Sequence, residues 1–216
     1  MDDWKLRKDV MDELDFEPSI DSASIGVAAK AGVVTLSGHV PNYAQKIAAE
    51  RAARRVKGVK AVALEIDVRY PDQAKTADDE IAKRALDILR WDALVPPGAV
   101  QVVVDKGWVT LSGAVDWQYQ KRAAEEDVRR LSGVVGVANS ITIKPAVQVA
   151  DVKKKIEDAL KRHAEIESEG IKVTVEGGRV RLDGKVDNWD EREAAENAAW
   201  SAPGVTAVDD RLQVAV

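Results

Sequence analysis

One glycine-bounded motif occurs three times in this chain, and the repetition constrains the fold more than any other feature of the sequence. Its copies are GVVTLSGHV (residues 32–40), GWVTLSGAV (107–115) and GRVRLDGKV (178–186). Another glycine follows the motif's second glycine after 20 positions in each copy: Gly58, Gly133 and Gly204. The copies lie 75 and then 71 residues apart, which is too long for a solenoid unit and suits three small domains. The predicted domains are residues 1–70, 71–146 and 147–216.

Each repeat predicts the same order of secondary structure. It opens with apolar residues four positions apart, as on one face of a helix: Leu6, Val10 and Leu14, then Ile81, Ala85 and Leu89, then Val152, Ile156 and Leu160. Alternating apolar residues then predict two strands joined by a tight glycine turn, followed by a second helix and a third strand. Because a helix joins the second strand to the third, these two strands should be parallel. The predicted fold class is α+β: three tandem α-β-β-α-β domains, each with two helices packed on a three-stranded mixed sheet.

The repeated glycines are expected to have structural roles. The second glycine of each motif falls on the inward side of its strand, where it leaves a gap unless another backbone fills it. We expect a helix to cross close to the sheet at these positions, the alternative being a simple bend at the strand end: Gly38, Gly113 and Gly184. We expect the later glycines to end the second helix in the left-handed conformation. These are Gly58, Gly133 and Gly204.

The order of elements and two sequence motifs resemble the BON family of bacterial domains. The motifs are the strand Gly-x-Val-x-Leu-x-Gly-x-Val and the ending Gly-Val-x-x-Val-x-Asn-x-Ile. The ending is most complete at residues 133–141, while Leu64 and Asp210 stand where that copy has Asn139. The resemblance covers nearly the whole chain. It implies a non-enzymatic module associated with phospholipid binding, envelope maintenance and osmotic stress, in a family whose members are often periplasmic.

Composition and charge exclude several other classes of protein. The chain has no cysteine, which excludes disulfides, thiolate metal sites and cysteine nucleophiles. Its formal net charge of -5 disfavours nucleic acid as a partner. The N-terminal residues lack the apolar core of a signal peptide, and no run approaches the roughly 18 apolar residues of a membrane span. As written, the chain is expected to be cytoplasmic, with no transmembrane segment.

No catalytic residue, cofactor or metal is expected. Neither His39 nor His163 has a histidine at the equivalent position of another repeat, and neither has a metal-ligand spacing. The glycines at 177 and 178 belong to a hairpin turn rather than to a phosphate-binding loop. We therefore expect the protein not to be an enzyme.

The second helix of the first repeat is the leading candidate for a binding surface. It carries five cations and one acid, Glu50. The cations are Lys46, Arg51, Arg54, Arg55 and Lys57. A basic amphipathic helix attracts anionic lipid headgroups by about 1 kcal/mol for each Lys or Arg near the surface. The alternative is a merely solvated charged face.

Several aromatic residues are further candidates. Phe16 and Trp91 are equivalent and end the first helix of their repeats, and Trp91 is followed by an apolar turn that contains Leu94. Such an aromatic suits a membrane interface or a partner pocket, or it closes the bottom of its own core. Trp108 and Trp117 have no aromatic counterpart in the other repeats, which indicates an interface peculiar to the middle domain.

Two functions from different classes follow from these surfaces. The first is docking on an anionic phospholipid surface; the second is a protein–protein scaffold or stress chaperone whose partners are proteins. The equivalent second helices differ in charge: +4 over residues 46–57, zero over 116–131 and -4 over 187–200. These opposite charges predict association of the first and third domains through their second helices, within one chain or between chains.

Overall fold

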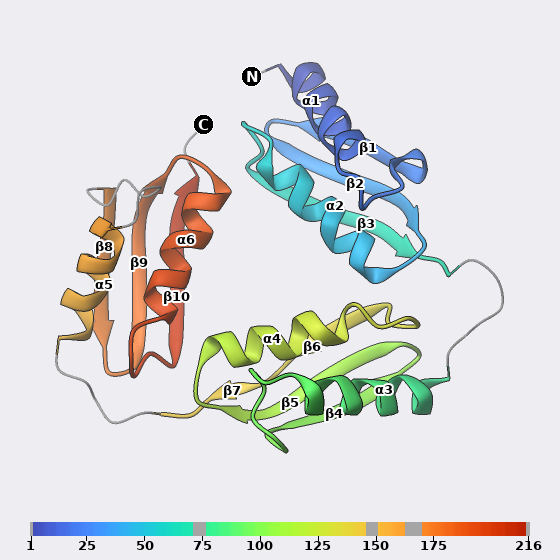
Figure 1. The fold of residues 1–216 in the computed structure, drawn as a ribbon. Coiled ribbons are helices and arrows are strands. Elements are labelled where there is room, and N and C mark those ends of the chain that lie inside the picture. Colours follow the sequence, from blue (N-terminus) through green and yellow to red (C-terminus); the bar gives the residue numbers. More distant parts are fainter. Residues whose placement is uncertain (1, 71–76, 146–150, 163–169, 215–216) are drawn as a thin grey trace. The chain divides into compact units, whose positions relative to one another are not determined.

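The computed structural model describes residues 2–70, 77–145, 151–162 and 170–214, and it shows three consecutive α/β units (Figure 1). The first unit contains α1 (Asp3–Phe16), the 3-10 helix η1 (Ser22–Ser24), β1 (Ile25–Lys30), β2 (Val33–Val40), α2 (Tyr43–Arg55) and β3 (Ala61–Val68). The second contains α3 (Asp78–Trp91), β4 (Val100–Asp105), β5 (Trp108–Val115), α4 (Gln118–Val128), β6 (Gly136–Asn139) and β7 (Thr142–Ile143). The third contains α5 (Val152–Arg162), β8 (Ile171–Glu176), β9 (Arg179–Val186), α6 (Trp189–Trp200) and β10 (Ala207–Val214). These elements confirm the predicted α+β class and the three tandem α-β-β-α-β domains.

The strand that carries the repeated motif is central in each sheet. β2 is antiparallel to β1 and parallel to β3, and β9 has the same relation to β8 and β10. β5 pairs in parallel with both β6 and β7, which together take the place of a single third strand. The parallel register is the same in the three domains: Val33 pairs with Ala61, Trp108 with Gly136, and Arg179 with Ala207. The mixed sheet is thus confirmed, and the break before β7 is the feature that the sequence pattern did not predict.

The predicted apolar stripes form the cores. Leu6, Val10 and Leu14 of α1 are buried with Val34 and Leu36 of β2. The equivalent residues of the other domains are buried too: Ile81, Ala85, Leu89, Val109 and Leu111, then Val152, Ile156, Leu160, Val180 and Leu182. Each second helix contributes small buried side chains that allow it to lie close to the sheet: Ala49, Ala52, Ala53, Ala124, Ala195 and Ala199. Burying one Leu, Ile or Val side chain contributes about 1.5–3 kcal/mol, so these stripes are what holds both helices on one face of the sheet.

The hairpin turns have two residues, and in the first two domains an aspartate at the start of the first helix holds the turn in place. Ala31 and Gly32 have φ of 51° and 84°, which are the two positive values of a tight hairpin turn. The Ala31 N–H donates to Asp3 Oδ1 at 2.8 Å. In the second domain the N–H groups of Lys106 and Gly107 donate to Asp78 at 2.7 and 2.9 Å. These aspartates thus tie the start of the first helix to the hairpin.

The prediction that a helix crosses at the motif's second glycine is wrong. The glycines have strongly positive φ values: Gly38 118°, Gly113 128° and Gly184 143°. A Cβ at these positions would lie 2.0, 2.1 and 2.0 Å from the carbonyl oxygens of Ser24, Ala99 and Gly170, respectively. Those carbonyls belong to the residues that enter the neighbouring antiparallel strand. The gap on the inward side of the motif is therefore filled by the adjacent strand's backbone and not by a helix.

The glycines at positions 58, 133 and 204 have the predicted positive φ, but they do not lie at the end of the second helix. Their φ values are 95° at Gly58, 93° at Gly133 and 88° at Gly204. The preceding helices already end at Arg55, Val128 and Trp200. The glycines lie in the turn that leads to the third strand, so the prediction that they end the helix is wrong, whereas the prediction of a positive φ is confirmed.

Replacement of Gly113 by alanine tests the close backbone approach. The added Cβ would meet the Ala99 carbonyl and would require a φ that side chains rarely adopt. We expect Gly113→Ala to lower the free energy of unfolding by about 2–4 kcal/mol. The matched control is Gly98→Ala, where φ is 71° but no atom lies within 4 Å. Gly98→Ala should lower the free energy of unfolding by only about 1 kcal/mol. Urea unfolding measures both, and equal losses would contradict the clash.

Candidate binding surfaces

Carboxylates of the same domain neutralise much of the predicted basic face of α2. Arg54 forms an ion pair with Glu50, one turn earlier. Arg55 Nη2 lies 2.9 Å from Glu13 Oε1 and 3.0 Å from Glu17 Oε2 on the first helix and its end. Hydrogen bonds from Ser19 and from Arg55 lower the pKa of Glu17, so this acid stays charged. Two of the five candidate cations, Arg54 and Arg55, are therefore paired with carboxylates of their own domain and are also exposed to solvent.

The remaining cations of α2 are spread along the helix. Lys46 is half-buried near its start and Arg51 is exposed in its second half, whereas Lys57 is exposed in the turn after the helix. Asn42 begins this helix, because its Oδ1 accepts the Gln45 N–H at 2.9 Å. The charge of this face thus comes mainly from its C-terminal half, where basic residues also interact favourably with the helix dipole.

The aromatic residues at the ends of the first helices point into solvent. Phe16 is 82% exposed and Trp91 is 86% exposed, so neither closes the bottom of its own core. Leu94, in the loop after Trp91, is more than half exposed. Equivalent positions of two domains thus carry large apolar side chains that their own domains do not bury, and the interpretation of these residues as core plugs is wrong.

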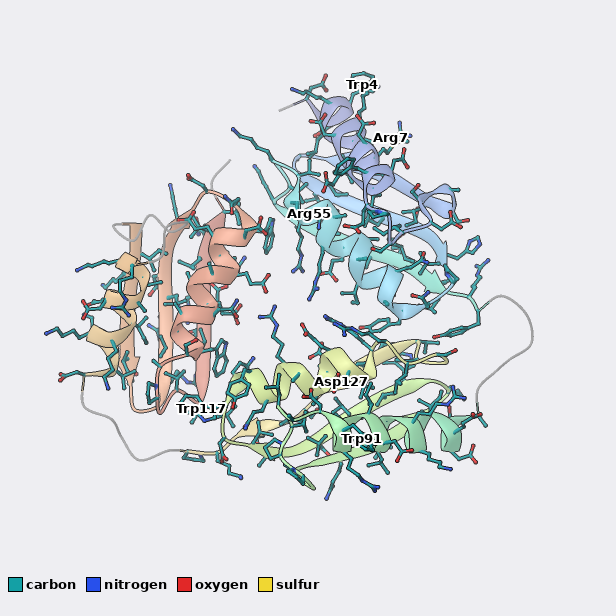
Figure 2. All side chains as sticks on the ribbon, viewed as in Figure 1. Trp4, Arg7, Arg55, Trp91, Trp117 and Asp127 are labelled. Atoms are coloured by element: carbon teal, nitrogen blue, oxygen red, sulfur yellow. The ribbon has the colours of Figure 1, made fainter. Side chains whose placement is uncertain are left out.

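An acid and an arginine accompany this aromatic residue in both domains. In the first domain, Glu17 follows Phe16 and accepts a hydrogen bond from Arg55. Arg55 lies at the end of α2 and is labelled in Figure 2. In the second domain, Asp92 follows Trp91, and Arg130, the equivalent of Arg55, lies just after α4. We call these two sets the helix-end corners: Phe16, Glu17 and Arg55 in domain one, and Trp91, Asp92 and Arg130 in domain two.

The third domain lacks such a corner. Arg162 stands where Trp91 does, and Ser201 stands where Arg130 does. His163, at the position of Asp92, lies outside the described residues. The third domain nevertheless has the same sheet and the same apolar stripes. The helix-end corner is therefore not a requirement of the fold, which makes it a candidate for function.

The corner of the second domain contains a carboxyl group that titrates close to neutral pH. Burial, and then a hydrogen bond with Asp92, raises the pKa of Asp127 to about 6. The buried Oδ2 atom of Asp127 has no hydrogen-bond partner within the described part of the chain. The positive charge of Arg130 lowers the pKa of Asp127, because it favours the charged carboxylate. Acidification thus removes a negative charge from the Asp127 and Asp92 pair.

Trp108 and Trp117 lie on other elements of the middle domain. Trp108 is on β5, with its ring so close to Gly136 that a Cβ there would come within 2.6 Å. Trp117 precedes α4 and stacks on Tyr119, with ring centroids 6.5 Å apart. Both are partly exposed, and an interface peculiar to this domain stays a prediction.

The position of Trp117 also shows a signal that the sequence analysis missed. At this position the other domains have Asn42 and Asn188, whose side chains accept backbone N–H groups at the start of the second helix. In the middle domain the Gln120 side chain accepts the N–H groups of Asp116 and Trp117. Glu191 accepts the Asp187 N–H in the same way in the third domain, where Asn188 also caps, so Gln120 does not replace the cap that position 117 lacks.

The described residues show no metal centre. No group of three or more His, Asp or Glu among them could hold a metal ion. His39 is exposed on β2. None of the helices that the structure describes is long and apolar enough to cross a membrane.

Three copies of one two-helix, mixed-sheet unit define a tandem-domain protein. The family described as "BON domain" matches residues 2–70, 77–145 and 148–216, so the chain belongs to the BON domain family, as its motifs predicted. It is 34% identical over 153 residues to the osmotically-inducible protein Y of Escherichia coli (strain K12). That alignment covers 67% of this chain and 74% of the relative.

Two solved structures of CdsD, a structural protein of the type III secretion system of Chlamydia trachomatis, also align with the chain. Both are 15% identical to it. One alignment covers 98% of this chain and 92% of that one, with a TM-score of 0.27. The other, to the C-terminal domain, covers 100% of both, with a TM-score of 0.28. Scores this low carry no argument about fold or function.

The raised pKa of Asp127 predicts a signed dependence of stability on pH. The folded chain binds this proton more tightly than the unfolded chain, where the pKa is near 3.8. The resulting stabilisation is fully present below about pH 4 and is lost as the pH rises through about 6. Asp127→Asn should therefore gain stability relative to the wild type over this range. The gain should be modest, because solvent screens a partly exposed group.

Urea unfolding of both proteins across this pH range measures the effect. Asp209→Asn is the control of opposite sign, because a hydrogen bond from Arg211 lowers the pKa of Asp209. That variant should be less stable than the wild type above the ordinary carboxyl pKa, and the difference should shrink as the pH falls below that value. A stability difference between Asp127→Asn and the wild type that does not change with pH would contradict the prediction.

Proposed function

We propose that this protein is a non-enzymatic binding module that docks on anionic phospholipid surfaces through its two helix-end corners, in a role connected with osmotic stress. The observation that carries the proposal is that equivalent positions of two domains have a solvent-exposed aromatic at the end of the first helix and an arginine at or just after the end of the second. The third domain folds without it. Membership of the BON family and similarity to the osmotically-inducible protein Y support a stress-related role without catalysis.

The chemistry of each corner suits the boundary between lipid headgroups and acyl chains. A Phe or Trp ring buries well at that boundary, and the indole N–H of Trp91 can remain hydrogen-bonded there. Burial of each ring contributes about 1.5–3 kcal/mol. A guanidinium recognises phosphate through paired N–H donors, so Arg55 and Arg130 would bind the headgroups.

The acids of the corners keep the attraction weak and reversible. Glu17 follows Phe16 and accepts a hydrogen bond from Arg55, so an anionic phosphate has to compete with Glu17 for this arginine. The basic face of α2 adds long-range attraction from Lys46, Arg51 and Lys57. Two corners in one chain increase the overall affinity, because binding of the first raises the effective concentration of the second.

Loss of the two aromatic rings tests this proposal. The protein should co-sediment with vesicles of phosphatidylcholine and phosphatidylglycerol at low salt, and less so at high salt. Phe16→Ala combined with Trp91→Ala should weaken this binding by about tenfold or more. The matched control is Trp4→Ala, which removes an aromatic that is 66% exposed at the opposite end of α1. Its binding should match the wild type.

Neighbouring arginines of α2 provide a second matched pair. Arg55→Gln removes a corner guanidinium, whereas Arg54→Gln makes the same charge change at a residue paired with Glu50. The first variant should bind anionic vesicles more weakly than the second. If the wild type does not bind anionic vesicles at low salt, the phospholipid proposal fails and a protein partner becomes the better explanation of the corners.

A further inference from the structure

Asp127 occupies a position of α4 where the other two domains have alanine. Its equivalents are Ala52, which is fully buried on α2, and Ala198, which is half-buried on α6. The residue after Asp127, Val128, is fully buried as well. The middle domain thus has a carboxyl group at the edge of its core, where a methyl group is sufficient for the fold.

The carboxyl group of Asp127 meets a second carboxyl group at the end of α3. That group belongs to Asp92, which follows Trp91 and whose backbone N–H donates to the Ile88 carbonyl at 3.0 Å. A hydrogen bond links the side chains of Asp92 and Asp127. Because an ionised carboxylate can only accept hydrogen bonds, this bond requires a proton on one of the two groups. The pair is therefore a place where the domain can bind a proton.

The surroundings of Asp127 favour the protonated form. Its Oδ2 atom is buried and has no hydrogen-bond partner within the described residues. Burial is the largest cause that raises the pKa of Asp127 to about 6, followed by the hydrogen bond and the charge of Asp92. Since each carboxylate disfavours ionisation of the other, the two groups titrate together. The pair therefore gains or loses one charge close to neutral pH.

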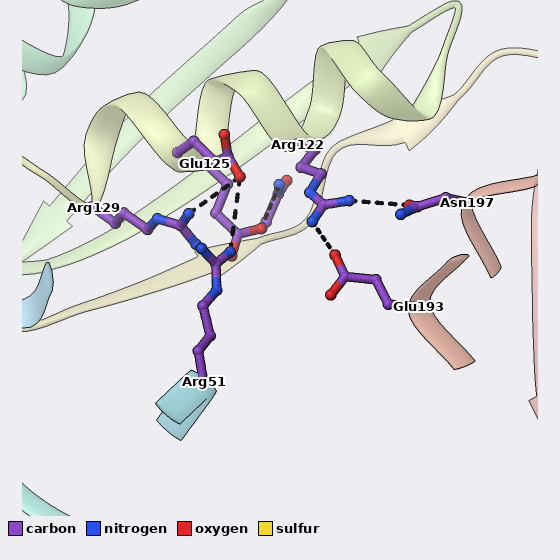
Figure 3. A network of polar contacts seen from close by, with 8 residues as sticks. Arg51, Arg122, Glu125, Arg129, Glu193 and Asn197 are labelled. Atoms are coloured by element: carbon purple, nitrogen blue, oxygen red, sulfur yellow. Dashed lines mark hydrogen bonds and ion pairs between the residues drawn. The ribbon is translucent and has the colours of Figure 1, made fainter. Parts of the chain in front are cut away.

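The other charged groups that act on Asp127 lie on α4 and just after it. Glu126 raises the pKa of Asp127, whereas Arg130 lowers it. Arg129, which is labelled in Figure 3, forms an ion pair with Glu126, with Nη2 3.2 Å from Oε1. Arg130 is exposed, so solvent screens its attraction for the pair. The positive charge near Asp127 is thus too weak to hold the pair fully ionised.

The equivalent corner of the first domain behaves in the opposite way. Its acid, Glu17, accepts a hydrogen bond from Arg55 at 3.0 Å, and Ala52 supplies no second carboxyl group. Hydrogen bonds from Ser19 and from Arg55 lower the pKa of Glu17. The corner of the first domain therefore keeps a constant charge near neutral pH, and only the corner of the second domain changes its charge there.

We propose that the Asp92 and Asp127 pair makes docking of the second-domain corner on an anionic phospholipid surface proton-dependent, with the bound proton strengthening the attachment. This inference rests on the proposed function, because it needs this corner to meet the headgroups. Asp92 directly follows Trp91, so negative charge on the pair opposes the approach of this ring to anionic phosphates. Proton uptake removes one negative charge, and by linkage an anionic surface favours proton uptake in return.

Vesicle binding at two pH values tests this coupling. At about pH 7 and low salt, Asp127→Ala should bind vesicles of phosphatidylcholine and phosphatidylglycerol about fivefold more tightly than the wild type, which is the effect of one charge near an anionic surface. At about pH 5 the two proteins should bind equally, because the pair of the wild type then holds its proton. Histidines titrate in this range too, but both proteins keep the two histidines of the chain.

Two further variants complete the comparison. Asp127→Asn keeps the size of the side chain and should behave like Asp127→Ala. Asp87→Ala is the matched control, because it removes an exposed acid from α3, one turn before Trp91. The ratio of its affinities at the two pH values should equal that of the wild type. Carbon-13 NMR of the carboxyl groups should show a titration at about pH 6 in the wild type that is absent from Asp127→Ala.

The results that contradict the proton coupling differ from those that contradict phospholipid docking. Equal binding of the wild type and Asp127→Ala at neutral pH would overturn the coupling alone, and so would a difference between them that persists unchanged at the acidic pH. Absence of the carboxyl titration from the wild type would do the same. If neither protein binds these vesicles at either pH, the coupling and the phospholipid proposal fail together.

Discussion

A carbonyl oxygen that enters the first strand of each domain occupies the place where a side chain on the central strand would begin. Gly38, Gly113 and Gly184 leave room for it, at about 2 Å from the position of a Cβ. This approach sets the first strand against the central strand, and the crossover helix then brings the third strand to the other edge in the same register in all three domains. Both helices must consequently lie on one face, with their C-terminal ends close together. Arg55 can therefore reach Glu17 although 38 residues separate them.

The fold thus places the C-terminal ends of the two helices together, and the residues at these ends determine the properties of that surface. Where the two helix ends meet, domains one and two have an exposed aromatic, an acid and an arginine. Domain three has Arg162 and Ser201 at two of these positions and keeps the same core. In the same way, the second helix has one backbone role in all three domains but a different charge in each. The cores of the three domains are nearly interchangeable, whereas their surfaces have diverged, and functions of this protein are to be sought there.

Much of the fold follows from periodicity in the sequence. The apolar stripes, the tight glycine turns and the parallel crossover depend on residues close together in the chain, and these predictions are confirmed. The role of Gly38 is different, because a sequence shows that a side chain is missing but not which backbone takes its place. For the candidate site, alignment of the repeats found Phe16 and Trp91 but not their exposure. Pairing of Arg55 with Glu13 depends on the folded distance between two helices, so the basic face of α2 looked less neutralised than it is.

The depth of Trp91 in a bilayer is the most direct test of the membrane account. A variant that keeps Trp91 and replaces the other five tryptophans with phenylalanine would be mixed with anionic vesicles whose lipids carry bromine at defined depths. The account predicts a blue-shifted Trp91 emission and quenching that is strongest for bromine just below the headgroups, both abolished by high salt. Emission that stays unshifted and unquenched while the protein co-sediments with the same vesicles would contradict it.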